Sequence, residues 1–105
     1  MPMIVSGSGI VTQINVFTVE AGGQNAMIEQ LARGVAIARG VPGWLSASLH
    51  KSLDGTRIVN YAQSESLTAA DAVIARLRDA GMIGRNADFG AAHPGLYEVV
   101  RTFEP

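Results

Sequence analysis

The chain has 105 residues, of which 48% are apolar and 16% are charged, and it has a net charge of −1 and no cysteine. This length suits a single domain with its own hydrophobic core. The near-neutral charge gives no electrostatic footprint for nucleic acid or an anionic membrane, and the absence of cysteine excludes disulfides and thiolate metal sites.

The N-terminal segment, residues 1–9, is expected to be a flexible arm, because Ser6-Gly7-Ser8-Gly9 is typical of linkers. It lacks the basic start and the apolar run of a signal peptide. No stretch approaches the ~20 apolar residues that span a bilayer, so we expect a soluble, cytoplasmic protein. One folded domain, residues 10–105, follows the arm.

Residues 10–20 are rich in β-branched and apolar side chains and predict a first strand. Residues 24–39 predict a helix, because apolar side chains recur there at helical spacing: Met27, Ile28, Leu31, Val35 and Ala38. Gly40 and then Pro42-Gly43 are expected to end this helix and to open the next element.

The segment 43–66 predicts a β-hairpin with a two-residue turn at Asp54-Gly55. Such a turn pairs Leu49 with Asn60 and Leu45 with Ser64. The register places Asn60 on the face that also has Leu45, Ala47 and Leu49. A polar amide on an otherwise apolar sheet face is a candidate functional group. Trp44 and His50 fall on the opposite face in this register.

A second helix is expected over 66–80, with a capping box of Thr68 and Asp71 at its start and Gly81 as its stop. Its buried stripe comprises Ala70, Val73, Ile74 and Leu77. Residues 82–93 have no clear pattern and leave room for a short helix. Pro94-Gly95 is expected to break the chain before a final strand over 96–103.

The element order is therefore β-α-β-β-α-β, the α+β ferredoxin-like arrangement, with both helices on one face of an antiparallel sheet. The other face would show Trp44, Val59 and Tyr61 to water. Apolar patches of this kind mark interfaces, so we expect a homodimer whose sheets pack against each other.

The run PGWLSASLHKSLDGTRIVNYAQSES resembles the hairpin of the antibiotic biosynthesis monooxygenase family, most specifically in VNYAQ after a DGT turn. The opening INVFTVEAGGQ and the close LYEVVRTFEP are also similar to that family, so the resemblance covers nearly the whole chain. It implies a dimeric α+β barrel that oxidises a small aromatic compound, of polyketide anthrone, phenol or quinol type, with O₂. It also implies that no metal, flavin or haem cofactor takes part.

The resemblance also implies roles for single residues. Asn60 matches the asparagine of the family motif that holds or polarises a substrate oxygen. Asn15 matches a first-strand asparagine linked to catalysis, and His50 matches the family's strand histidine. The tryptophan that ends the motif is replaced by Ser64, which enlarges the expected pocket. This departure favours an alternative, a non-catalytic small-molecule-binding or accessory dimer on the same barrel.

The chemistry implied by the resemblance needs a deprotonated substrate in a dry pocket, where amide N–H groups stabilise the oxyanion. His50 has a suitable intrinsic pKa for a general base, and His93 is a weaker candidate. The pocket is expected to be lined by Phe17, Leu45, Leu49, Ser64, Ile74 and Leu77.

Structural alternatives stay open: Asn60 and Asn15 as satisfied buried amides, and His50 at the dimer interface or in solvent. A third possibility is haem degradation or lactone isomerisation, for which the only tryptophan, Trp44, is in the wrong place.

Overall fold

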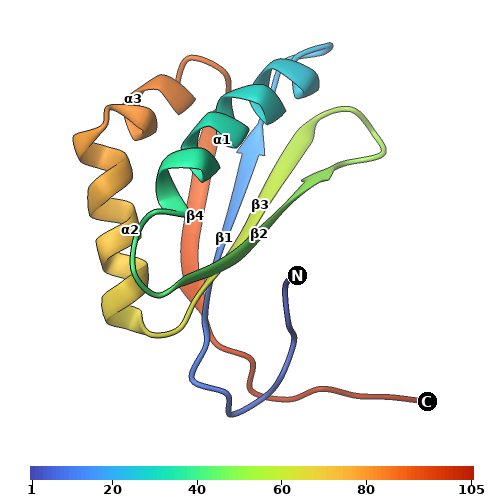
Figure 1. Ribbon diagram of the computed structural model, residues 1–105. Helices are drawn as coiled ribbons and strands as arrows, with labels where there is room; N and C mark the ends of the chain where they lie inside the picture. Colours follow the sequence, from blue (N-terminus) through green and yellow to red (C-terminus); the bar gives the residue numbers. More distant parts are fainter.

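The computed structural model describes residues 1–105. The elements follow the order β1 (Val11–Thr18), α1 (Gln24–Ala38), β2 (Trp44–Lys51), β3 (Arg57–Ser64), α2 (Leu67–Asp79), α3 (Met82–Asn86) and β4 (Ala91–Tyr97). The strands form one antiparallel sheet in the order β2-β3-β1-β4, and the helices cover one of its faces (Figure 1). The α+β ferredoxin-like prediction is confirmed. No helix is long and apolar enough to span a bilayer.

The hairpin of β2 and β3 has the predicted register over most of its length, since Leu49 pairs with Asn60. The register shifts at the start of β2, where Trp44 pairs with Ser64 and Leu45 is the extra residue of a β-bulge. A bulge interrupts the alternation of side chains between the two faces. Leu45 is 45% exposed, whereas Trp44 turns toward the helices. The predictions of Leu45 as a pocket wall and of Trp44 on the open face are both wrong.

The hairpin loop is longer than the predicted two-residue turn. The Ser52 N–H donates to the Arg57 carbonyl oxygen over 3.0 Å, and the Gly55 N–H donates to the Ser52 carbonyl oxygen over 3.3 Å. Gly55 has a φ of 83°, a left-handed conformation that glycine adopts without strain. The loop consists of residues 53–56, so it adds one residue on each side of the predicted turn. Because the two additions are equal, the register of the strands is unchanged.

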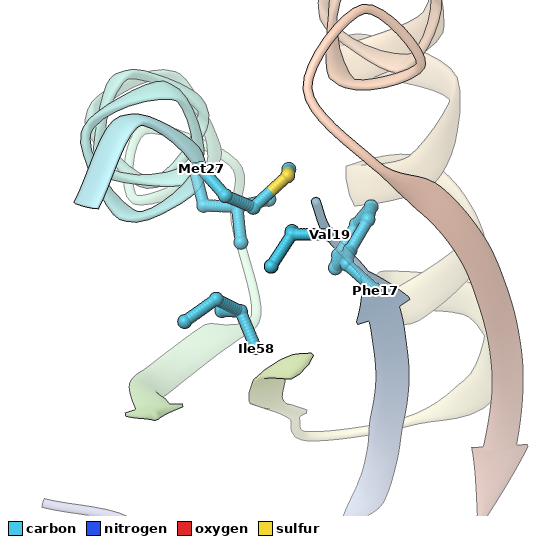
Figure 2. Close-up of a cluster of buried hydrophobic side chains, with 5 residues drawn as sticks. Phe17, Val19, Met27 and Ile58 are labelled. Atoms are coloured by element: carbon cyan, nitrogen blue, oxygen red, sulfur yellow. The ribbon is translucent and has the colours of Figure 1, made fainter. Parts of the chain in front are cut away.

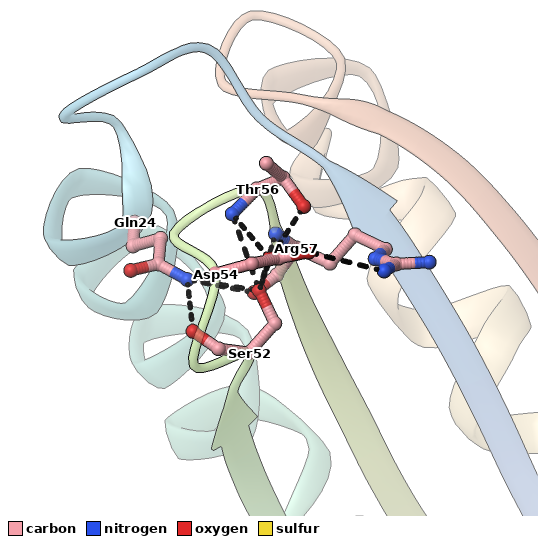
Figure 3. Close-up of polar contacts among 5 residues, drawn as sticks. All are labelled: Gln24, Ser52, Asp54, Thr56 and Arg57. Atoms are coloured by element: carbon pink, nitrogen blue, oxygen red, sulfur yellow. Dashed lines mark hydrogen bonds and ion pairs between the residues drawn. The ribbon is translucent and has the colours of Figure 1, made fainter.

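Side-chain hydrogen bonds hold this loop together (Figure 3). The Asp54 carboxylate accepts bonds from the Thr56 hydroxyl (2.7 Å), the Ser52 hydroxyl (2.8 Å) and the Thr56 N–H (3.0 Å). These donors, the Thr56 hydroxyl first, hold the pKa of Asp54 well below its ordinary value. Gln24 Nε2 donates to the Ser52 and Arg57 carbonyl oxygens, each over 3.0 Å, and so ties the start of α1 to the hairpin.

The main hydrophobic cluster lies between α1 and the sheet (Figure 2). It contains Phe17, Val19, Met27, Leu31 and Ile58. Phe17 and Ile58 are direct partners on β1 and β3, and Met27 packs over them from α1 with no exposed surface. Leu49 packs against this cluster, so it belongs to the core and not to the pocket wall predicted for it.

The start of α2 differs from the predicted capping box. Ser66 is the N-cap, and its hydroxyl oxygen accepts a 3.1 Å hydrogen bond from the Ala69 N–H. Thr68 already lies inside the first helical turn, so it has no part in the cap. Gly81 has a φ of 76° directly after the helix and is the predicted stop.

The last strand, β4, begins earlier than predicted and contains Pro94 and Gly95, which were expected to break the chain. β4 is an edge strand, where proline is tolerated because its missing N–H can point away from the sheet. The residues after Tyr97, expected to form most of the strand, have no regular secondary structure. The segment over 82–93 contributes α3, the short helix for which the sequence left room.

The N-terminal arm returns to the sheet on the side away from the helices. The Met3 N–H donates to Gln63 Oε1 over 2.7 Å, and Gln63 Nε2 donates back to the Met3 carbonyl oxygen. Gln63 is 1% exposed and also bonds to Thr12 and Ser46. The arm is therefore attached to the sheet at one point and lacks regular structure elsewhere.

Candidate active site

Two adjoining hollows lie between the sheet and the helices. The larger, of about 190 Å³, is bounded by β1, β3, β4 and all three helices. The smaller, of about 40 Å³, extends beneath α1 and α2 toward the start of β2. Both are lined by Gln13, Leu31, Asn60, Leu77 and Asn86. Together they form one mostly apolar site in which carboxamides supply the polar lining, as small-molecule sites typically do with a few placed polar groups.

Asn60 projects from the middle of β3 into this site. Its Oδ1 atom is buried and has no hydrogen-bond partner. Because an unsatisfied buried acceptor costs about 1–3 kcal/mol, buried amides are almost always bonded. No helix end supplies a partner for this oxygen, so its partner is a water or a ligand in the cavity. The side chain is free to bond a ligand.

Asn15 is the direct partner of Asn60 on the neighbouring strand, β1. Its Oδ1 accepts a 3.1 Å hydrogen bond from the His93 N–H of β4. Since a backbone N–H can only donate, this bond fixes the orientation of the Asn15 amide. The Nδ2 group, a donor, is left to the cavity that Asn15 lines.

The apolar wall of the larger hollow includes Phe17, Ile74 and Leu77, three of the residues predicted from the sequence. Ser64 lines a separate hollow of only about 10 Å³ near the end of β3. The aromatic side chain opposite Ser64 is Trp44, which lines the smaller lobe of the site. The large space expected from a serine at position 64 is therefore not present.

The two histidines lie on the other face of the sheet. His50 Nε2 is 2.8 Å from the Ser48 hydroxyl, and its ring meets Tyr61 edge-on with centroids 6.3 Å apart. His93 Nδ1 is 3.1 Å from the Val16 carbonyl oxygen. Neither lines the hollows, whose lining residues include no ionisable side chain. The sequence had already placed His50 opposite Asn60, and the structure has it there.

Among the lining residues that sequence reasoning missed, three have polar or aromatic side chains. Gln13 alternates with Asn15 and Phe17 along β1, so strand periodicity could have revealed it. Trp44 reaches the site only through the bulge, and Asn86 only through the position of α3. No sequence signal indicated these last two.

The model of the antibiotic biosynthesis monooxygenase family matches residues 10–77, and the chain belongs to this family. Among curated proteins, tetracenomycin-F1 monooxygenase of Streptomyces glaucescens is 36% identical over 67 residues. That alignment covers 63% of this chain and 60% of the length of the relative.

Solved structures have the same fold. The ActVA-Orf6 monooxygenase of Streptomyces coelicolor, in complex with nanaomycin D, superposes with a TM-score of 0.78 at 31% identity, over 93% of each chain. SnoaB of Streptomyces nogalater, a cofactor-independent oxygenase, superposes with a TM-score of 0.80 at 21% identity, over 92% of this chain and 99% of its own. At that identity the second likeness concerns the fold alone.

Proposed function

We propose that this protein is a cofactor-independent monooxygenase that oxidises a small aromatic compound of anthrone, phenol or quinol type with O₂. The observation that carries the proposal is the unpartnered, buried Oδ1 of Asn60 in an apolar cavity. Family membership supports it, as does the binding of nanaomycin D by ActVA-Orf6, a relative that covers nearly the whole chain.

The site suits an electron-rich substrate whose oxygen faces the carboxamides. A phenolate or carbanion passes one electron to O₂, and the substrate radical and superoxide then combine into a peroxide. For an anthrone, one oxygen atom becomes the new carbonyl, and the other leaves as water with the two hydrogens of the oxidised CH₂. Asn60 and Asn15 stabilise the negative charge on the substrate through hydrogen bonds that need no proton transfer to the protein.

The size of the site restricts the substrate. A closed apolar cavity of about 150 Å³ binds benzene, so the larger hollow of about 190 Å³ takes one ring or a fused pair. The smaller hollow under Trp44, of about 40 Å³, takes a substituent and not a ring, so a third ring must extend through the open side of the larger hollow. In this position the substrate oxygen lies where the two hollows meet, beside Asn60.

We also propose a homodimer formed through the sheet face opposite the helices. Strand alternation places Val59 and Tyr61 on this face, because Asn60 between them faces the cavity. Both are only partly buried in the single chain. Trp44, expected at this interface from the sequence, is absent from it. Light scattering on Tyr61→Glu tests the proposal: it predicts a dimeric wild type and a monomeric variant, and a monomeric wild type contradicts it.

The test of the oxygenase is incubation of the purified protein with a panel of anthrones and hydroquinones, in air and under argon, with a chelator and no added cofactor. We expect anthraquinones from the anthrones and hydroxylated quinones from the hydroquinones, in air alone, with one oxygen atom of O₂ in the product and the other released as water. Ligand binding without any oxygen-dependent product would support the binding-protein alternative, which Ser64 in place of the motif tryptophan favours.

A further inference from the structure

A chain of three polar side chains leads from the surface of α1 into the candidate site. Arg33 Nη2 and Nε lie 3.2 and 3.4 Å from Gln30 Oε1. Gln30 Nε2 donates in turn to Asn86 Oδ1 over 3.2 Å. Asn86, at the end of α3, lines both hollows, so the chain of contacts ends at the substrate cavity.

The direction of the hydrogen bonds in this chain, from donor to acceptor, is determined by Arg33 at its outer end. A guanidinium can only donate hydrogen bonds, so Gln30 must present its oxygen to Arg33. The Gln30 amide nitrogen is then directed at Asn86, which must accept with Oδ1. The Asn86 Nδ2 group has no acceptor in the protein, and it is the atom of this amide left to bond a ligand.

Gln30 is 2% exposed, so water cannot replace either of its partners. A buried amide with its oxygen and its nitrogen both engaged is held in one orientation. Arg33 itself is exposed, so solvent screens its charge and its electrostatic effect on the cavity is small. Its main effect is therefore to orient Gln30.

We infer that Asn86 is a substrate-binding residue that donates a hydrogen bond to an aromatic oxyanion, and that Gln30 and Arg33 are positioning residues that fix it as a donor. The inference rests on the proposed function and names the form of substrate that the site selects: a phenolate or enolate. Asn15, fixed by His93, and Asn86 then present donors to the same cavity. Asn60 is the one amide of the three with no partner to fix it.

Fixed donors favour the anion over the neutral phenol, because hydrogen bonds to a charged oxygen are stronger. The site therefore lowers the pKa of a bound phenol without a base of its own. Arg33 is the charged group within this chain of contacts. The remaining charged side chains at the neighbouring ends of α2 and α3 are all exposed: Arg76, Arg78, Asp79, Arg85 and Asp88.

The test uses 4-nitrophenol as the probe, because its phenolate absorbs visible light and its neutral form does not. The pKa of the bound probe is measured by spectrophotometric titration. We expect wild type to lower this pKa relative to free probe, and Asn86→Leu to raise it by about 1–2 units, the value of one hydrogen bond to a charged group. Affinity for the phenolate should fall about 10- to 100-fold in the same variant.

Gln30→Glu is the sharpest variant, since it keeps the size of the side chain and the contact with Arg33. A carboxylate only accepts, so Asn86 must turn its nitrogen toward position 30 and its oxygen toward the cavity. We expect this variant to weaken phenolate binding at least as much as Asn86→Leu, and circular dichroism checks that it is folded, because a carboxylate at this buried position loses hydration. Arg39→Met, at the exposed end of the same helix, is the control for a change in net charge, and it should leave the bound pKa unchanged.

An unshifted pKa of the bound probe in both Asn86→Leu and Gln30→Glu, in folded protein, would overturn the inference. Failure of the wild type to bind the probe would overturn it too. The readout does not depend on turnover. A lowered probe pKa in a protein that never consumes O₂ would therefore keep the inference and remove the oxygenase.

Discussion

Replacing Asn60 by leucine should stabilise the fold while it lowers the rate of oxygenation at least ~100-fold. Leucine has nearly the shape of asparagine and no polar atoms. The wild-type Oδ1 is buried without a partner, and an unsatisfied acceptor of this kind costs about 1–3 kcal/mol. Removing this cost raises the free energy of unfolding by a similar amount. For a domain of this size, each gain of about 1 kcal/mol corresponds to about 4–8 °C in melting temperature.

Asn15→Leu is the matched control. It makes the same substitution at the paired position on β1, where the amide oxygen is satisfied by the His93 N–H. Removing that acceptor should cost about 1 kcal/mol or more. The assay is thermal unfolding of both variants by circular dichroism at one protein concentration, with turnover measured alongside. If Asn60→Leu lowered the melting temperature as much as Asn15→Leu does, the reasoning about the unpartnered oxygen would be refuted.

Three further predictions concern other parts of the chain. The hydrogen bonds of the hairpin loop lower the pKa of Asp54 in the folded state. They therefore stabilise the fold fully above the unfolded pKa of about 3.9, and this stabilisation is lost as the pH falls toward the folded pKa. Asp54→Asn should therefore unfold more easily than wild type at pH 7, and denaturation curves should show this difference shrinking below about pH 4; a constant difference would count against it. Ser66→Ala removes the bond to the Ala69 N–H and should cost about 1 kcal/mol in urea denaturation, whereas Thr68→Ala should cost less. Trp44 is the only tryptophan, so ligand entry into the smaller lobe should change its fluorescence, and an unchanged spectrum at saturating ligand would place the ligand elsewhere.

The sequence was sufficient where a feature depends on local pattern. Alternation along β3 and the turn at Asp54-Gly55 placed Asn60 on the face covered by helices, and the pairing with Leu49 followed. The longer loop did not alter this, because added residues on both sides of a turn conserve the register. The element order followed in the same way from periodicities of two and 3.6 residues.

Features that depend on tertiary contacts could not be predicted from sequence patterns. The bulge at Leu45 moves Trp44 from the open face to the cavity. The alternation of side chains along a strand does not predict where a bulge inserts an extra residue. Pro94 normally ends a strand, and only the edge position of β4 makes it acceptable. The contribution of Asn86 depends on where α3 lies and on Gln30, a buried polar residue on α1.

The most direct test of the central claim, that the free Asn60 carboxamide serves oxygenation of an aromatic anion, is a labelling measurement with ¹⁸O₂. We expect one labelled oxygen atom in each anthraquinone formed from an anthrone. We also expect folded Asn60→Leu to react at least ~100-fold more slowly than wild type, because a hydrogen bond to a developing oxyanion is removed. Unlabelled product, or labelled product formed by Asn60→Leu at the wild-type rate, would refute this role of Asn60.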